Sequence, residues 1–246
     1  MSTRIALITG ANKGIGFETA RRLGGLGWTV LVGARSAELG EKAVAALAGE
    51  DADARFVHLD VTDADGIGAA AERIEREHGR LDVLVNNAGI APADAAVAPS
   101  ETPLDAMRRT YETNVFGVVA VTNAMLPLLR RSPAGRIVNL SSELGSLGIV
   151  TDPSSPFFPV NLLAYNSSKT ALNAVTVAYA KELADTPIKV NAANPGYCAT
   201  DMNMHTGFRT AVQGAEEVVR LATLDEAGPS GAFQGGTDEP GAPLPW

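Results

Sequence analysis

Short runs of β-branched and other apolar residues alternate along the chain with longer, Ala-rich segments whose apolar positions recur at helical spacing. The apolar runs predict strands at residues 5–9, 29–34, 55–59, 81–86, 136–141 and 188–194, with a short last strand near 231–234. The segments between them predict helices near residues 16–26, 37–48, 66–78, 102–129 and 162–184. We expect the fourth of these helices to break at Pro127.

Alternation of strand and helix is typical of a parallel sheet that helices bury on both faces. We therefore expect an α/β fold in which residues 1–246 form a single doubly wound domain with about seven strands. Three stretches interrupt the rhythm: residues 91–103, a proline-rich loop insertion at about 144–161, and the tail from 228 to 246. We also expect a substrate-lid region at about 197–215. Ligands bind such folds at the carboxyl ends of the strands, so binding residues should directly follow strands.

Composition narrows the class of protein. The 246 residues are 46% hydrophobic and 20% charged, which is typical of one soluble domain with a sizeable core. The net charge of -8 repels phosphate backbones and anionic membranes, so nucleic acid and membrane are not expected as partners. One cysteine and three scattered histidines indicate no disulfide and no metal site. No stretch approaches the ~20 apolar residues of a membrane span, and we expect a cytoplasmic protein.

A glycine-rich loop directly follows the first expected strand: Gly10-Ala11-Asn12-Lys13-Gly14-Ile15-Gly16. Glycine lets the backbone turn sharply and lets a pyrophosphate approach the amides, and the positive end of the next helix favours negative charge. The spacing is G-x-x-x-G-x-G and not G-x-G-x-x-G, so the prediction of a dinucleotide site depends on the position between strand and helix. The alternative is a purely structural turn.

Three motifs occur in a fixed order along the chain: Thr9-Gly10-x-x-x-Gly14-Ile15-Gly16, then Asn86-Asn87-Ala88-Gly89, then Tyr165-x-x-x-Lys169. They fall after the first strand, after the fourth strand and at the start of the fifth helix. In this arrangement the chain resembles the short-chain dehydrogenase/reductase family over nearly its whole length. The resemblance implies a Rossmann-fold oxidoreductase that uses NAD(P)(H), with Asn87, Ala88 and Gly89 on the adenine side of the cofactor.

The end of the second strand indicates which dinucleotide is bound. Enzymes that choose NAD usually place an acid there, whereas this chain has Ala34 followed by Arg35. A guanidinium suits a phosphate, and Lys13 can add a second positive charge, so we expect NADP(H). The alternative is that both are solvated surface charges. Asp60 and Val61, after the third strand, resemble the family's adenine contacts.

Tyr165 and Lys169 are four residues apart on an expected helix, so their side chains share one face. A free phenol has a pKa of about 10, and a neighbouring ammonium is expected to lower it toward working pH. Such a pair can pass a proton to a carbonyl oxygen. The resemblance implies that Tyr165 is the proton donor and that Lys169 also binds the nicotinamide ribose. The alternative is an ordinary pair on a helix surface.

The resemblance implies three further contacts in the site. Ser142, in the family pattern S-x-x-G, would orient the reacting carbonyl, and Asn114 would hold Lys169 through water. A purely structural hydrogen bond is the alternative for Asn114, because asparagine inside an apolar helix demands partners. The segment from Pro195-Gly196 to Thr200 resembles the family's P-G-x-x-x-T, which meets the nicotinamide carboxamide.

The segment between Ser142 and Tyr165 is longer than in most members, which resembles the carbonyl-reductase-like branch. Its Phe157 and Phe158 either wall a pocket for apolar or aromatic carbonyl substrates or merely anchor the loop. The insertion could also cover helix surfaces used for assembly, which favours a monomer over a dimer or tetramer. The resemblance therefore implies NADPH-dependent reduction of a ketone or aldehyde, with reversible alcohol oxidation. Alternatives are a non-catalytic NADP-binding regulator and an isomerase or dehydratase.

Overall fold

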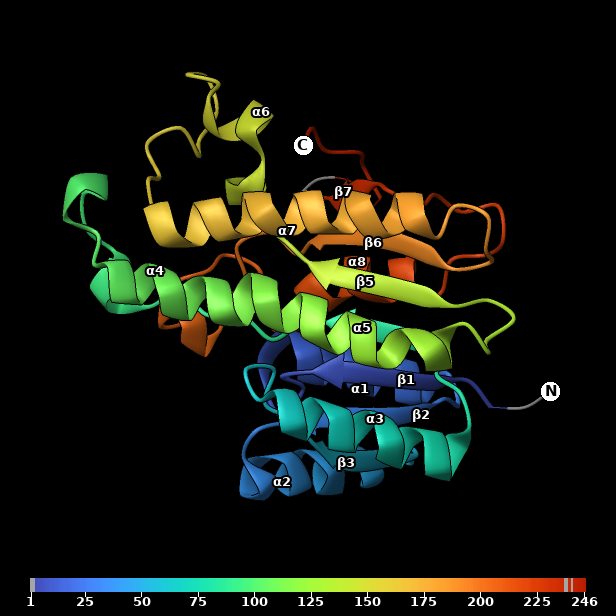
Figure 1. Cartoon of the computed structure of the whole chain (residues 1–246). Coiled ribbons are helices and arrows are strands. Elements are labelled where there is room, and N and C mark those ends of the chain that lie inside the picture. Colours follow the sequence, from blue (N-terminus) through green and yellow to red (C-terminus); the bar gives the residue numbers. More distant parts are fainter. Residues whose placement is uncertain (1–2, 237–238, 240) are drawn as a thin grey trace.

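The parallel sheet expected from the sequence forms the centre of the molecule (Figure 1). The computed structural model describes residues 3–236, 239 and 241–246. Within them seven strands follow the order β3-β2-β1-β4-β5-β6-β7, all parallel. The strands are β1 (Ile5–Thr9), β2 (Thr29–Ala34), β3 (Ala54–His58), β4 (Val83–Asn86), β5 (Arg136–Leu140), β6 (Lys189–Asn194) and β7 (Phe233–Gly235). The doubly wound α/β prediction is confirmed.

Helices cover both faces of the sheet (Figure 1). The helices are α1 (Gly14–Gly25), α2 (Ala37–Ala48), α3 (Ala64–His78), α4 (Leu104–Tyr111), α5 (Gly117–Leu129), α6 (Leu147–Val150), α7 (Leu163–Glu182) and α8 (Ala211–Ala222). Helices α3, α5 and α7 contribute to the core on one face, and α1, α2 and α8 to the core on the other. The sequence analysis did not predict α6 or α8, and it extended the lid to residue 215, whereas α8 begins at Ala211.

The fourth expected helix breaks at a different place from the one predicted. Pro127 lies inside α5, and the interruption is a π-helical turn, η3 (Glu112–Phe116), between α4 and α5. By length and composition the run Leu104–Leu129 could cross a membrane, contrary to the sequence expectation, with a mean hydropathy of 1.3 in its most apolar window. Half of that window is buried inside the molecule. We assign its apolar character to packing against the sheet and α3.

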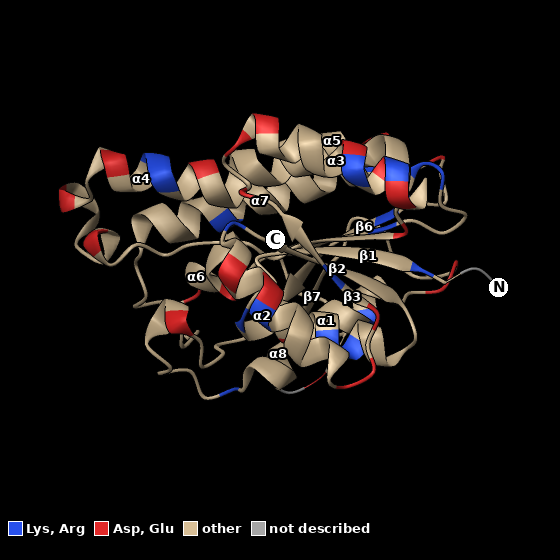
Figure 2. Ribbon diagram, turned by 90° about the horizontal axis from the view of Figure 1, so that it is seen from below, with Lys and Arg blue, Asp and Glu red and all other residues tan. Residues whose placement is uncertain are grey.

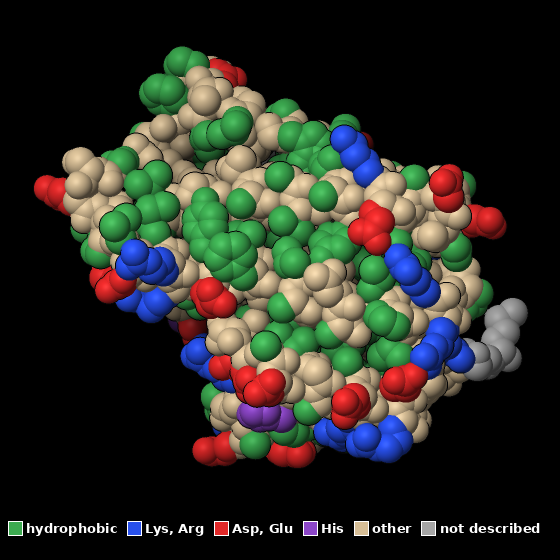
Figure 3. Space-filling model, in the orientation of Figure 1, with side chains coloured by type: hydrophobic (Ala, Val, Ile, Leu, Met, Phe, Trp, Pro, Cys, Tyr) green, Lys and Arg blue, Asp and Glu red, His purple; other side chains and the backbone are tan. Residues whose placement is uncertain are grey.

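Charged residues lie mainly on the outer helices and loops, while the central strands carry few of them (Figure 2). The outer surface between α5 and α7 is different, because hydrophobic side chains gather there (Figure 3). A shallow groove runs along it, and its lining is Val119, Asn123, Val175, Ala178, Tyr179 and Glu182. The loop insertion does not line this groove.

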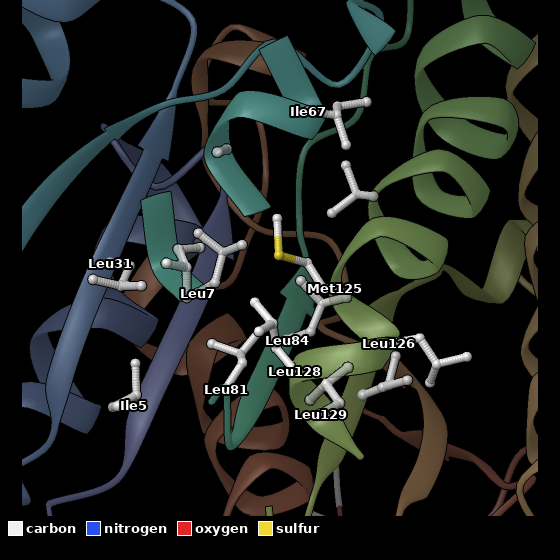
Figure 4. Packing of buried hydrophobic residues seen from close by; sticks show 14 of the residues in the cluster. Ile5, Leu7, Leu31, Ile67, Leu81, Leu84, Met125, Leu126, Leu128 and Leu129 are labelled. Carbon is white, nitrogen blue, oxygen red and sulfur yellow. The ribbon is translucent and has the colours of Figure 1, made fainter. Parts of the chain in front are cut away.

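Apolar side chains from the strands and from α5 interlock in the larger core cluster (Figure 4). Leu7 of β1, Leu84 of β4 and Met125 of α5 are fully buried in it. Each such side chain stabilises the fold by about 1.5–3 kcal/mol relative to exposure. Because both faces of the sheet are covered, β1 and β4 are apolar up to their last residues, Thr9 and Asn86, which lie at the carboxyl edge.

Candidate active site

The glycine loop forms a tight turn at the end of β1, and Asn87 holds its shape. Gly10 and Gly14 adopt positive φ angles of 64° and 59°. Asn87 Nδ2 donates to the carbonyls of Thr9 (2.8 Å) and Gly10 (3.1 Å). The Thr9 hydroxyl accepts from the backbone amides of Asn87 and Ala88, each at 3.0 Å. The first and second sequence motifs are thus joined in one hydrogen-bonded unit.

This unit fits a bound pyrophosphate. Helix α1 begins at Gly14, two residues earlier than expected, so its free amides point at the loop. A β-carbon on Gly16 would lie 2.5 Å from Asn87 Nδ2 and 2.8 Å from the Gly10 carbonyl oxygen. Only glycine leaves the helix start this close to the loop. The remaining loop residues, Asn12 and Ile15, are half-buried beside it.

Arg35 is exposed at the end of β2, where the adenosine end of a dinucleotide would lie. Asp60, after β3, accepts from the Thr62 amide (2.9 Å) and hydroxyl (2.8 Å). These hydrogen bonds, with a smaller effect from nearby Arg35, hold the pKa of Asp60 below its ordinary value. The adjacent Val61 is buried. Arg35, Asp60 and Val61 therefore follow the carboxyl ends of the neighbouring strands β2 and β3.

Lys13 has a partner that the sequence did not indicate. Its Nζ lies 2.6 Å from Asp201 Oδ2, and Asp201 also contacts His205 Nε2 at 2.9 Å. Asp201 belongs to the short turn η5 (Asp201–Asn203), which Thr200 caps. Both members of the Lys13 pair are more than half exposed, so the pair is weak and a phosphate could compete for the lysine.

Ser142 and Tyr165 meet at the carboxyl end of β5. The Ser142 hydroxyl lies beside the Tyr165 hydroxyl and favours its ionised form, and Ser142 Oγ accepts from the Leu144 amide at 3.2 Å. Ser142 caps the short turn η4 (Glu143–Gly145), and Tyr165 lies in the first turn of α7. The neighbouring Ser141 points elsewhere, to Asn173 Oδ1 at 2.5 Å. The Ser141 hydroxyl is therefore bound to α7.

Lys169 is buried beside this pair. Its Nζ lies 5.7 Å from the centre of the Tyr165 ring and donates to the Leu140 carbonyl at 2.7 Å. Burial lowers the pKa of Lys169 to about 8. Burial likewise raises the pKa of Tyr165 to about 12, the opposite of the direction expected from the sequence. The reason is that desolvation of the phenolate outweighs the other effects, while the ammonium is bound to Leu140.

Asn114 is fully buried in the π-helical turn. It exchanges hydrogen bonds with the backbone of Ile90, accepting from N at 2.8 Å and donating to O at 2.9 Å, and donates to Ser168 Oγ at 3.0 Å. A β-carbon on Gly89 would lie 3.4 Å from Asn114 Oδ1 and 3.6 Å from Lys169 Nζ. The two side chains therefore converge beside Gly89. The structural hydrogen bond considered from the sequence is present.

The Pro195–Gly196 turn follows β6 at the same edge. Gly196 has a φ of 73°, and its amide donates to Asn194 Oδ1 at 3.1 Å. Thr200 reaches the glycine loop, since a β-carbon on Gly14 would lie 3.6 Å from its methyl group. Cys198 is buried there, and burial raises the pKa of its thiol to about 11, so the thiol is inert. In the described residues no group of His, Cys, Asp and Glu could hold a metal.

Sequence reasoning missed two acidic residues of this site. Asp201 pairs with Lys13, and Glu143 is buried directly after Ser142. Neither lies in a recognisable motif. For Glu143 the only signal was its position, an acid between the expected catalytic serine and an apolar segment.

The chain is similar to known proteins over most of its length. The family model described as short chain dehydrogenase matches residues 4–209. A short-chain dehydrogenase of Penicillium roqueforti is 40% identical over 225 residues, covering 89% of this chain and 88% of that protein. A (+)-neomenthol dehydrogenase of Capsicum annuum is 32% identical and covers 94% and 95%.

Solved structures are also similar. That of salutaridine reductase from Papaver somniferum has a TM-score of 0.82 at 32% identity and covers 94% of this chain and 99% of its own. The NADPH-bound carbonyl reductase from chicken fatty liver has a TM-score of 0.82 at 28% identity and covers 95% and 96%.

Proposed function

The chain belongs to the short-chain dehydrogenase family, and we propose that within it the protein reduces a ketone or aldehyde to an alcohol with NADPH. The observation that carries the proposal is the position of Tyr165 beside Ser142 and the buried Lys169, at the same sheet edge as the glycine loop. Similarity to a salutaridine reductase and to an NADPH-bound carbonyl reductase supports the direction of the reaction.

The chain's own residues supply proton and orientation, while bound NADPH supplies the hydride. Tyr165 donates its proton to the carbonyl oxygen, and its pKa of about 12 keeps it protonated at neutral pH. Ser142 donates a hydrogen bond to the same oxygen as negative charge develops there. Lys169, held by Leu140 and close to Asn114, binds the cofactor's ribose and its charge favours the phenolate left after proton transfer.

Three features support NADP(H) over NAD(H). Arg35 is exposed at the end of β2 with Ala34 in place of an acid, and Lys13 stands in the glycine loop. The carbonyl reductase of similar structure is described as NADPH-bound, as is an actinorhodin polyketide ketoreductase with 29% identity and a TM-score of 0.81. Arg35→Ala should weaken NADPH binding and leave NADH binding unchanged in a fluorescence titration. Equal losses for both cofactors would contradict the assignment.

The loop insertion after β5 and the lid after β6 favour an apolar or aromatic substrate. The loop insertion exposes Leu147 and Phe158, and Phe158 is 50% exposed, too open to be an anchor in the core. The lid exposes further apolar side chains: Tyr197, Met202, Met204 and Phe208. These surfaces favour a bulky carbonyl compound without an anionic group. We also propose a cytoplasmic location and a monomer.

Turnover of a panel of aldehydes and ketones, followed by NADPH absorbance, tests the function. Wild type should oxidise NADPH with apolar ketones, and Tyr165→Phe should lose turnover by several orders of magnitude while binding NADPH as before. A fully active Tyr165→Phe variant would overturn the mechanism. NADPH binding without oxidation by any carbonyl would favour a cofactor-binding regulator instead.

A further inference from the structure

Asn173 is a buried polar residue of α7, the long helix beside β5 and β6 (Figure 1), and the reduction described above does not use it. It follows Lys169 by one helical turn and Tyr165 by two, so the three side chains lie along one side of the helix. Only 4% of Asn173 is exposed. Burying an amide costs free energy unless its oxygen and its amino group both find partners. The partners of Asn173 therefore show what it holds in place.

Both partners of the Asn173 side chain belong to the segment that carries Ser142. The Ser141 hydroxyl donates to Asn173 Oδ1 at 2.5 Å, and Asn173 Nδ2 donates to the Gly145 carbonyl at 3.2 Å. Ser141 directly precedes Ser142, and Gly145 is the last residue of η4, the turn that Ser142 caps. One side chain of α7 thus binds the chain on both sides of Ser142.

Two further contacts fix the same segment against α7. Lys169 Nζ donates at 2.7 Å to the carbonyl of Leu140, the last residue of β5. Gly145 packs directly on the helix, because a β-carbon there would lie 2.7 Å from Lys169 Cβ. Helix α7 therefore holds this segment at residues 140, 141 and 145. Ser142 lies between these points and is half-buried.

The Ser142 hydroxyl is oriented only within its own turn. Ser142 Oγ accepts from the Leu144 amide at 3.2 Å, which leaves the hydroxyl proton for donation to a carbonyl oxygen. Since this bond stays inside the turn, the position of the hydroxyl relative to α7 depends on how the whole turn is held. Asn173 provides two of the hydrogen bonds that hold it.

We propose that Asn173 is a positioning residue for the reduction: it holds the Ser142 turn in place against the helix that carries Tyr165 and Lys169. This role rests on the proposed function. The carbonyl oxygen must meet Ser142 and Tyr165 at the same time, and the two residues come from different elements. A shift of the turn by about 1 Å would misplace the Ser142 hydroxyl and slow the reaction without touching the cofactor site.

The first test is steady-state kinetics per folded molecule. Asn173→Ala should lower kcat/KM for ketone reduction about tenfold or more, while the Kd for NADPH stays within about twofold of wild type. Ser141→Ala removes only one of the two bonds and should cause a smaller loss of the same kind. Because the two side chains share that bond, the double variant should be no slower than Asn173→Ala. Wild-type kcat/KM in Asn173→Ala, or losses that multiply in the double variant, would overturn the proposal.

Thr176→Val is the matched control. Thr176 is fully buried on the same side of α7, but its hydroxyl accepts from Asn139 Nδ2 at 2.9 Å, so it binds the middle of β5 and not the Ser142 turn. This variant should lose stability, measured by urea unfolding, and keep the wild-type kcat/KM. An equal loss of activity in Thr176→Val and Asn173→Ala would mean that the packing of α7 in general sets the rate, which contradicts the specific role of Asn173.

A second measurement does not depend on turnover. Backbone hydrogen exchange in residues 143–146 reports how firmly the turn is held, since the Gly145 amide donates to the Ser142 carbonyl at 2.9 Å. Asn173→Ala and Ser141→Ala should speed exchange there, and Thr176→Val should not. If wild type reduces no carbonyl, the proposed function fails, while exchange still tests whether Asn173 holds the turn. Wild-type exchange in Asn173→Ala would show that it does not.

Discussion

Within the glycine loop, position 16 is the one where an added side chain would have the least room. A β-carbon there would meet the Asn87 amide at 2.5 Å, the Gly10 carbonyl at 2.8 Å and the Ala11 Cα at 3.0 Å. Two of these neighbours are backbone, so they cannot move aside without opening the loop. We expect Gly16→Ala to weaken NADPH binding at least about tenfold and to lower the free energy of unfolding by about 1–3 kcal/mol. Fluorescence titration and urea unfolding measure the two effects.

Gly25, at the other end of the same helix, is the control. A β-carbon there has no atom within 4 Å. Gly25→Ala should leave NADPH binding unchanged and be neutral or slightly stabilising, because alanine loses less backbone entropy on folding. If Gly16→Ala binds NADPH as tightly as Gly25→Ala does, the pyrophosphate does not lie against this loop.

Tyr165 and Lys169 show what residue spacing can and cannot predict. Their separation of four correctly predicts a shared helix face, since the ammonium lies over the ring. The direction of the Tyr165 pKa depends on burial and on the Leu140 carbonyl that binds Lys169. Leu140 ends β5, far away in sequence, so no pattern local to α7 could reveal this contact.

At the level of elements, the strands and most helices followed from hydrophobic period, because a sheet covered on both faces needs apolar runs. Helix α8 was missed although it begins with a capping box, Thr210 with Gln213, and buries Val218 and Leu221. Its first residues, up to 215, were assigned to the lid, and the rest of it to no element. The π-helical turn at Asn114 was also missed, because its extra residue depends on the bonds between Asn114 and Ile90 across the site.

The last described residues form a strap that fixes the start of the loop insertion. Residues 241–246 run beside β7, with the Leu244 amide bound to the Phe233 carbonyl at 2.9 Å. Trp246 stacks on Phe233 with ring centres 5.5 Å apart. Ser146 Oγ, the cap of α6, donates to the Pro245 carbonyl at 2.6 Å. The strap therefore holds α6, which follows the Ser142 turn.

Ser146→Ala should release this contact and remove the α6 cap, at a cost of about 1 kcal/mol. We expect faster backbone hydrogen exchange in residues 147–150 and little change in α7. Ser154→Ala is the control, because the Ser154 hydroxyl bonds only to Asp152 within its own turn among the contacts that the structure describes. Equal exchange in the two variants would show that the strap does not hold the loop.

At the scale of the whole molecule, the structure removes the reason for which the sequence favoured a monomer. The loop insertion was expected to cover helix surfaces, yet the groove between α5 and α7 is open and hydrophobic side chains gather over it (Figure 3). The groove is shallow, and Asn123 and Glu182 are among its lining residues. Light scattering over a range of concentrations decides the matter, and a stable dimer or tetramer would discard the monomer.

The two edges of the sheet have different roles: residues at the carboxyl edge form the site, and Arg136 at the amino edge stabilises the fold. The carboxyl edge holds the site, whereas the amino edge carries Arg136, a buried arginine of β5. Its guanidinium donates to the carbonyls of Leu224 (2.8 Å), Asp225 (3.0 Å) and Pro187 (3.1 Å), joining the loops before β6 and after α8 to the sheet. Arg136→Met keeps much of the side-chain length but leaves these three carbonyls without their donor.

We expect Arg136→Met to lower the free energy of unfolding by about 2–4 kcal/mol, measured by urea unfolding, because hydrogen bonds from the buried, charged guanidinium to three backbone carbonyls are lost. NADPH affinity and kcat per folded molecule should stay at wild-type values, since no residue of the site lies at this edge. Reduced NADPH affinity at unchanged stability would mean that the amino edge acts on the site. The expected result is the reverse of that for Tyr165→Phe, which leaves the fold intact and removes the proton donor at the opposite edge.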